Sequence, residues 1–86
     1  MIFSIYYSNQ SKKFIEKLEK ISKNRVKKAI EKLLENPFPK ETTRVESYKD
    51  YKVFRIRIGH FRILYFVDYD DTSITIIKID KRERVY

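Results

Sequence analysis

Cysteine is absent from this 86-residue sequence, and histidine and glycine each occur once. Without cysteine the chain has no disulfides and no thiolate metal sites, and one histidine argues against a histidine-based metal cluster. We therefore expect no metal and no cofactor.

The sequence also lacks a long apolar run: no segment approaches the ~20 residues that a membrane-spanning helix needs. The residues Met1 to Tyr6 have neither the basic lead nor the small-residue cleavage site of a signal peptide. These absences predict a cytoplasmic protein without membrane contact. With 42% hydrophobic residues, seven tyrosines and six phenylalanines, the chain can bury a core, so we expect one domain over residues 1–86.

Positive charge is abundant. Twenty Lys and Arg residues against twelve Asp and Glu give a net charge of +8. Such a surface attracts nucleic acid, anionic membranes or acidic proteins. The alternative is a solubility feature of a proteome rich in charged residues. Charge alone does not decide between them.

The first half of the sequence predicts a strand followed by two short antiparallel helices. The strand covers 1–7, where β-branched and aromatic residues dominate. Ser8 to Ser11 supply N-cap residues for the first helix, and Ser22 offers a second N-cap. Asn36-Pro37 ends the second helix. Apolar residues recur at helical spacing, as Phe14, Leu18 and Ile21 in the first stripe and Val26, Ile30, Leu33 and Leu34 in the second.

The second half predicts strands. Residues 38–50 read as a loop with a short strand around 44–46, and strands follow at about 52–58, 61–68 and 73–80. The predicted fold is α+β with the order β-α-α-β-β-β. A helical hairpin packs on one face of a mostly antiparallel, twisted sheet.

A turn at Gly59-His60 fixes the pairing of two of these strands. Gly-X is typical of a two-residue type II′ turn, which pairs Ile58 with Phe61 and Arg57 with Arg62. One face of the hairpin is then entirely apolar, and a slip of one residue would place arginine in it. The helices should cover that apolar face, which consists of Phe54, Ile56, Ile58, Phe61, Ile63, Tyr65 and Val67.

The opposite face carries Arg55, Arg57 and Arg62. Arg57 opposite Arg62 is a like-charge pair that costs stability. Arginine also binds phosphate through two parallel hydrogen bonds, which lysine does not. We therefore predict a phosphate-binding face, with an ordinary solvated basic face as the alternative. The segment Lys81-Arg82-Glu83-Arg84-Val85-Tyr86 adds further cations and a tyrosine suited to base stacking or proton transfer, although a frayed end is the plain alternative.

Two of these motifs resemble the RelE branch of the RelE/ParE toxin superfamily, particularly its archaeal members. The run from Phe54 to Tyr65 is similar to the family pattern aromatic-Arg-x-Arg-x-Gly-x-aromatic-Arg, and 81–86 is similar to its closing basic-Arg-x-x-Val-Tyr motif. The element order agrees as well. The resemblance implies a type II toxin that cleaves mRNA in the ribosomal A site without a metal, by attack of the ribose 2′-OH.

The resemblance also assigns residues. It implies Arg62, Arg82 and Tyr86 as catalytic, with Arg62 on the phosphate, Arg82 near the leaving oxygen and Tyr86 stacked on a base. A second group is assigned to RNA or phosphate binding: Arg55, Arg57, Lys52, Lys81 and Arg84. Strand alternation places Lys52 on the face opposite the arginines.

The sequence does not identify the general base of this reaction. Some relatives carry lysines where this chain has Arg55 and Arg57, and arginine is a poor base because its pKa exceeds about 12. The other candidates are Glu46, His60, Glu83 and Tyr86, of which Tyr86 is favoured because neighbouring arginines stabilise a phenolate.

The resemblance implies two partners, an acidic RelB-type antitoxin that forms a hetero-oligomer with the toxin, and mRNA on the ribosome with rRNA contacts. Two alternatives remain. One is a ParE-like inhibitor of DNA gyrase, and the other is a non-catalytic nucleic-acid-binding module.

Overall fold

A computed structural model describes residues 3–40, 42–48 and 50–81, with the side chains of 46–48 outside the description. The elements in chain order are β1 (Ser4–Tyr7), α1 (Asn9–Glu16), α2 (Lys20–Glu35), β2 (Thr43–Tyr48), β3 (Tyr51–Ile58), β4 (Phe61–Asp68) and β5 (Ser73–Lys81). The predicted α+β class and the helical hairpin are confirmed. The loop predicted at 38–50 contains a full six-residue strand, β2, longer than the segment around 44–46.

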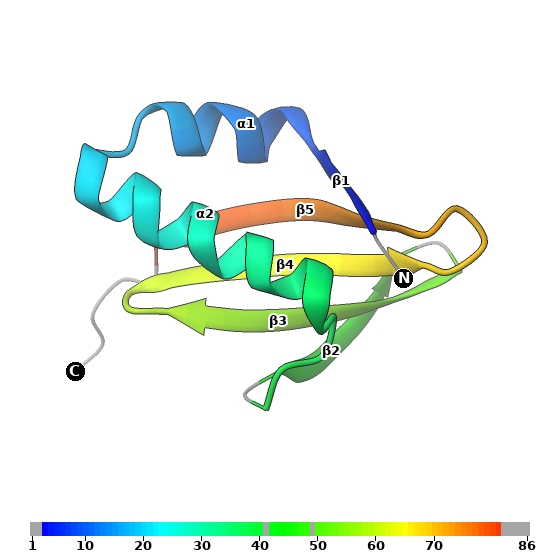
Figure 1. The fold of residues 1–86 in the computed structure, drawn as a ribbon. Helices are drawn as coiled ribbons and strands as arrows, with labels where there is room; N and C mark the ends of the chain where they lie inside the picture. The colour runs from blue at the N-terminus through cyan, green and yellow to red at the C-terminus, as the bar shows by residue number, and fades with distance from the viewer. Residues whose placement is uncertain (1–2, 41, 49, 82–86) are drawn as a thin grey trace.

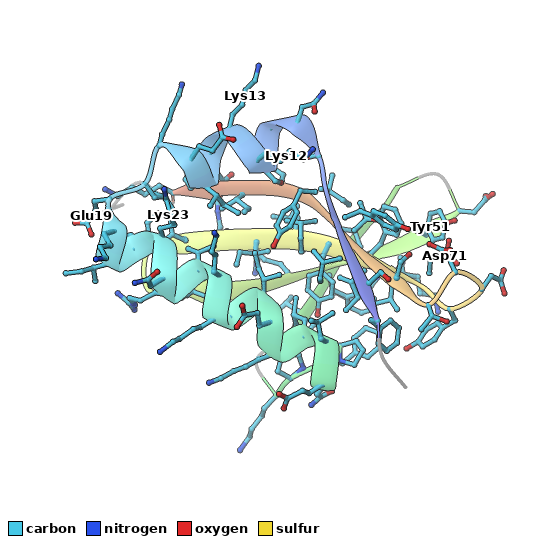
Figure 2. All side chains as sticks on the ribbon, turned by 45° about the horizontal axis from the view of Figure 1, so that its top comes forward. Lys12, Lys13, Glu19, Lys23, Tyr51 and Asp71 are labelled. Carbon is cyan, nitrogen blue, oxygen red and sulfur yellow. The ribbon has the colours of Figure 1, made fainter. Side chains whose placement is uncertain are left out.

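The five strands form one sheet in the order β1-β5-β4-β3-β2. Only the β1–β5 pair is parallel. Both helices lie on the same face of the sheet, α2 across its middle and α1 beside β1 and β5 (Figure 1). The core lies between these layers, and its fully buried members are Val26, Ile30, Leu33, Ile63, Tyr65, Ile74, Ile76 and Ile79. Lys12 and Lys13 of α1 are exposed to solvent (Figure 2).

The junction between the helices differs from the sequence prediction. The N-cap of α2 is Glu19, whose carboxylate accepts a hydrogen bond from the Ser22 amide at 3.1 Å, so Ser22 is not the cap. Ile21 is 70% exposed and does not belong to the apolar stripe. The reason is geometric: Val26 follows Ile21 by five residues, which rotates Ile21 away from the face that Val26 and Ile30 bury.

Tyr65, in the centre of β4, joins the sheet to the end of α2. Its side chain is fully buried, and its hydroxyl donates a hydrogen bond to the Pro37 carbonyl oxygen just after the helix. Burial raises the pKa of the Tyr65 phenol, because the apolar surroundings disfavour the phenolate. Tyr65 therefore holds the helical layer against the sheet by packing and by one buried polar contact.

The β3–β4 hairpin has the predicted register. Arg57 pairs with Arg62 and Ile58 with Phe61. Gly59 has φ +60°, and among the described non-glycine residues only Thr72 has a positive φ, so His60 does not. This combination is that of a type II′ turn. The single glycine of the chain therefore stands where a positive φ is required.

We expect the substitution Gly59→Ala to lower the free energy of unfolding by about 1–2 kcal/mol, the cost of a left-handed conformation for a residue with a Cβ. An added Cβ would also lie 3.0 Å from Nη2 of Arg25, but the tip of that flexible side chain can move. Urea titration followed by circular dichroism measures the loss. His60→Ala in the same turn serves as the control, and equal stability of Gly59→Ala and the unmodified chain would contradict the prediction.

A bulge interrupts the pairing of β5 with β4. Tyr65 pairs with Ile76 but Leu64 pairs with Lys78, which leaves Ile77 without a partner on β4. The N-cap and first turn of α1 bind the backbone at this bulge and just after it. The Ser8 hydroxyl donates to the Ile77 carbonyl at 2.6 Å, and the Gln10 amide exchanges two hydrogen bonds with the Ile79 backbone, at 2.8 and 3.0 Å.

Candidate phosphate-binding site

The face of the sheet away from the helices carries the predicted arginine cluster at its β3–β4 end. Arg57 and Arg62 are direct cross-strand partners, and Arg55 lies two residues from Arg57 on the same face. Arg57 is exposed, whereas Arg55 and Arg62 are half-buried. We call this group, Arg55, Arg57 and Arg62, the arginine cluster.

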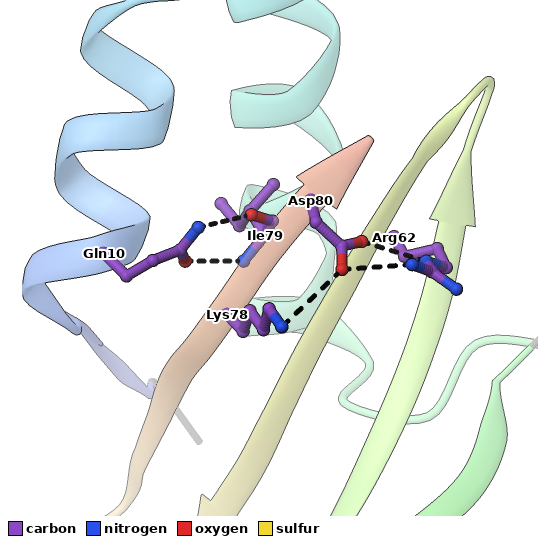
Figure 3. A network of polar contacts seen from close by, with 5 residues as sticks. All are labelled: Gln10, Arg62, Lys78, Ile79 and Asp80. Carbon is purple, nitrogen blue, oxygen red and sulfur yellow. Dashed lines mark hydrogen bonds and ion pairs between the residues drawn. The ribbon is translucent and has the colours of Figure 1, made fainter. Parts of the chain in front are cut away.

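Asp80 of β5 supplies a carboxylate to this cluster. It is the cross-strand partner of Arg62 on the side opposite Arg57. The Arg62 guanidinium donates from Nε to one Asp80 oxygen at 2.9 Å and from Nη2 to the other at 3.1 Å (Figure 3). The Lys78 ammonium lies 4.0 Å from the second oxygen. The like-charge pair therefore has an internal counter-ion, which the sequence interpretation did not include.

This pairing orients Arg62. A guanidinium has five N–H donors in one plane, and Asp80 engages only the Nε–Nη2 edge. The two hydrogens on Nη1 take no part in the ion pair. Because the plane is fixed by two hydrogen bonds, the Nη1 end is held in one direction, where it can donate to a phosphate oxygen.

The β5 bulge explains why sequence reasoning missed Asp80. The pairing that starts at Asp68 with Ser73 would, if continued without interruption, place Ile79 opposite Arg62. The extra residue, Ile77, shifts the register by one and brings Asp80 there instead. No local pattern in the sequence marks this bulge; what stabilises it is hydrogen bonding from α1, which is distant in sequence.

We expect Asp80→Asn to lower the free energy of unfolding slightly. The loss should be smaller when Arg62 is already replaced, because the ion pair is then absent. The two side chains are 27% and 35% exposed, so solvent screening limits their coupling energy to about 0.5–1 kcal/mol. A double-mutant cycle with Asp80→Asn and Arg62→Ala in urea measures this coupling. Strict additivity of the two losses would show that the ion pair contributes nothing to stability.

Aromatic residues occupy the other end of the same face. The Tyr51 ring stacks on Phe66 with centroids 4.3 Å apart and planes at 17°. The Tyr51 hydroxyl donates to the Asp68 carboxylate at 3.1 Å, and this hydrogen bond, with the negative charge of Asp68, raises the pKa of the tyrosine. Tyr51 therefore keeps its proton near neutral pH and does not serve as a base there.

The remaining predicted residues that the structure describes, Lys52, His60 and Lys81, are not gathered with the arginines. Lys81 pairs with Phe61 and Lys52 alternates with Val53, which places both on the helix-covered side of the sheet. Both are exposed. His60 is exposed in the turn. The predictions for Arg82, Glu83, Arg84 and Tyr86 fall outside the described residues, as does the side chain of Glu46.

The described ranges contain neither a candidate metal centre nor a membrane-spanning helix. Those residues contain no group of three histidine, cysteine or acidic side chains placed to hold a metal ion. They also contain no helix long and apolar enough to cross a membrane.

Comparison with known proteins identifies the family. Residues 5–86 match the family model described as the ParE toxin of the type II toxin–antitoxin system parDE. The RelE1 protein of Methanocaldococcus jannaschii is 37% identical over 87 residues, covering 100% of this chain and 97% of the relative. The chain belongs to the RelE/ParE toxin superfamily. The resemblance drawn from the arginine run and the closing motif is therefore confirmed.

Solved RelE structures agree with this assignment. The archaeal RelE of the RelE–RelB complex from Pyrococcus horikoshii OT3 superposes with a TM-score of 0.84 at 27% identity, covering 99% of this chain and 100% of the other. The isolated Escherichia coli RelE toxin has the same fold, with a TM-score of 0.77 at 20% identity and coverage of 96% and 87%. The two-helix, five-strand arrangement is thus the RelE fold.

Proposed function

We propose that this RelE-like toxin is an endoribonuclease that inhibits translation in the cytoplasm by cutting mRNA in the ribosomal A site. The observation that carries the proposal is the arginine cluster: three guanidinium groups on one face of the sheet, one of them oriented by a carboxylate. Such a surface is suited to an RNA phosphate and to the extra negative charge of its transition state.

The proposed reaction needs no co-reactant. The ribose 2′-OH loses its proton and its oxygen attacks the adjacent phosphorus, while the bond from phosphorus to the 5′-oxygen breaks. The products are a 2′,3′-cyclic phosphate and a 5′-hydroxyl, and the leaving oxygen takes up one proton. The arginine cluster stabilises the charge on the non-bridging oxygens, and in-line positioning of the 2′-OH supplies part of the rate.

Roles within the site follow the family motif. Arg62 holds the scissile phosphate, and Arg55 and Arg57 bind the same or a neighbouring phosphate. Arg82 lies near the leaving 5′-oxygen, Tyr86 stacks on a base and accepts or donates a proton, and Arg84 adds a phosphate contact. Lys52 and Lys81, on the other side of the sheet, contact RNA phosphates outside the arginine cluster. With arginine at 55 and 57 the chain lacks a strong acid–base pair, so we expect little cleavage of free RNA.

Two partners follow from this function. A ribonuclease active on cellular mRNA requires an inhibitor, and the net charge of +8 suits an acidic antitoxin. The Pyrococcus horikoshii relative is a RelE–RelB complex, which supports a RelB-type antitoxin for this chain as well. The second partner is mRNA on the ribosome.

Primer extension on ribosome-bound mRNA after induced expression tests the proposal. We expect discrete cuts at A-site codons with the unmodified toxin and a loss of cuts with Tyr86→Phe. Equal cleavage of naked and ribosome-bound mRNA would overturn the ribosome dependence, and growth inhibition that survives both Arg82→Ala and Tyr86→Ala would overturn the cleavage.

The family-model match to ParE toxins makes gyrase inhibition the second candidate. A supercoiling assay with purified DNA gyrase separates the two functions. Inhibition of supercoiling without any mRNA cuts would replace the nuclease with a ParE-like activity.

A further inference from the structure

Two different elements cover the outer edge of β5, the edge away from β4. Strand β1 pairs with it in parallel from Ser73 to Ile76 and ends at Tyr7, opposite Ile76. Beyond that point no strand among the described residues continues along this edge. The chain turns into α1 instead, and the start of this helix lies beside β5 (Figure 1).

Gln10, in the first turn of α1, contacts β5 in the way that a residue of a neighbouring strand would. Its carboxamide nitrogen donates to the Ile79 carbonyl oxygen at 2.8 Å, and its carboxamide oxygen accepts from the Ile79 amide at 3.0 Å (Figure 3). A strand residue exchanges the same two hydrogen bonds with its partner in an antiparallel ladder, using its own amide and carbonyl. Gln10 therefore fixes the Ile79 backbone where β1 no longer reaches.

Two serines at the start of α1 bind the residues that precede Ile79. The Ser8 amide donates to the Ile76 carbonyl oxygen at 2.9 Å, and the Ser11 hydroxyl donates to the same oxygen at 3.3 Å. The Ser8 hydroxyl binds the next carbonyl, that of the bulge residue. The start of α1 thus holds β5 before the bulge, at the bulge and after it.

The contact from Gln10 lies next to the carboxylate that orients the arginine cluster. Asp80 follows Ile79 directly, and it accepts both hydrogen bonds from the Arg62 guanidinium. The Ile79 side chain is fully buried on the helix-covered side of the sheet, so Asp80 faces the arginines by strand alternation. A rotation of the Ile79 backbone would therefore move the Asp80 carboxylate and the guanidinium that it holds.

We propose that Gln10 is a positioning residue of the phosphate-binding site: by fixing the Ile79 backbone it places Asp80, which directs Arg62 toward a phosphate. That this phosphate belongs to RNA rests on the proposed function. Gln10 is exposed to solvent, so its hydrogen bonds compete with water and contribute little to the free energy of unfolding. Its removal is expected to disturb the site more than the fold.

Hydrogen exchange followed by nuclear magnetic resonance tests the positioning without any substrate. The variant Gln10→Met keeps the length of the side chain but forms neither hydrogen bond. We expect the Ile79 amide and the Arg62 Nε hydrogen to exchange at least roughly threefold faster, because local opening controls exchange. The Tyr65 amide in the core should keep its rate. Lys13→Met, at an exposed position of the same helix, is the matched control and should leave all three rates unchanged.

Single-turnover cleavage on programmed ribosomes measures the consequence for the reaction. For Gln10→Met we expect the maximal rate to fall by about 5–50-fold with little change in the half-saturating ribosome concentration, because a small misplacement of a reacting group costs up to about 10²-fold. In the Asp80→Asn background the same substitution should have no further effect. If Gln10→Met proves poorly folded by circular dichroism, Gln10→Glu, which keeps the oxygen that accepts from Ile79, provides the second variant.

Three results would contradict the positioning role. One is an unchanged exchange rate of the Arg62 Nε hydrogen, and another is an equal loss of cleavage with and without Asp80. The third is faster exchange at Tyr65 as well, which would show that Gln10 only anchors α1 to the sheet. Because the exchange measurement needs neither RNA nor ribosomes, a lack of cleavage by the unmodified toxin would count against the proposed function alone.

Discussion

Replacing Arg62 with alanine is expected to reduce ribosome-dependent mRNA cleavage by about 10²–10³-fold, the loss typical when one preorganised donor to a developing oxyanion is removed. Arg62 combines two features that suit it to holding the scissile phosphate. It belongs to the arginine cluster, and its guanidinium plane is fixed by the two hydrogen bonds that it donates to the Asp80 carboxylate. Single-turnover cleavage on programmed ribosomes measures the effect.

Two further variants distinguish geometry from charge. Arg62→Lys keeps the positive charge but loses the planar fork, so we expect most of the activity to be lost. Lys13→Ala on α1 removes one positive charge far from the cluster and should change the rate by less than twofold. If Arg62→Lys cleaves as well as the unmodified toxin, a point charge is sufficient and the orienting role of Asp80 is wrong.

Replacing Tyr65 with alanine is expected to lower the free energy of unfolding by about 3–5 kcal/mol, the range for large aromatic residues in cores. The residue is fully buried at the centre of β4, so truncation leaves a cavity between the sheet and the helices. For a domain of this size, each kcal/mol lost from the free energy of unfolding lowers the midpoint temperature of thermal unfolding by about 4–8 °C. Thermal melting should therefore show a fall of at least about 12 °C.

The variant Tyr65→Phe separates the hydroxyl from the ring. It removes the hydrogen bond to the Pro37 carbonyl and is expected to cost about 1 kcal/mol. It should also change how the free energy of unfolding depends on pH in the alkaline range. Because burial raises the folded pKa of Tyr65 above its ordinary value of 10.0, its stabilising contribution is complete below pH 10 and is lost as pH rises through the folded pKa.

Urea titrations at increasing pH measure this. Stability should fall more steeply above pH 10 in the unmodified protein than in Tyr65→Phe. Identical pH profiles for the two proteins would show that the buried phenol does not contribute to alkaline unfolding.

The fold was predictable where periodicity is strong. The apolar face of the β3–β4 hairpin and the single glycine at 59 determine the register, and both predictions agree with the structure. The start of α2 was not predictable from the sequence, because serine is a preferred N-cap residue and glutamate is not, yet Glu19 caps the helix in place of Ser22. Strand β2 was underestimated because its short, mixed sequence gains its strand conformation from pairing with β3.

The candidate site was predictable only in part, because some of its contacts join elements that are distant in sequence. Alternation on one hairpin places Arg55, Arg57 and Arg62 together. Asp80 reaches them only through a bulge that α1 stabilises across the sheet. Contacts between elements distant in sequence leave no local pattern, so sequence reasoning finds the cations and misses the carboxylate that orients one of them.

The bulge at Ile77 also limits which insertions and deletions the gene can tolerate. Residues before it and after it alternate in opposite phase, so pairing of the full-length β5 with β4 without the bulge would exchange the two faces for everything that follows Ile77. Asp80 would then turn toward the helices and Lys81 toward the arginines. Deletion of Ile77 itself would instead join Ile76 to Lys78 in regular alternation, which keeps both the core and the arginine face as they are.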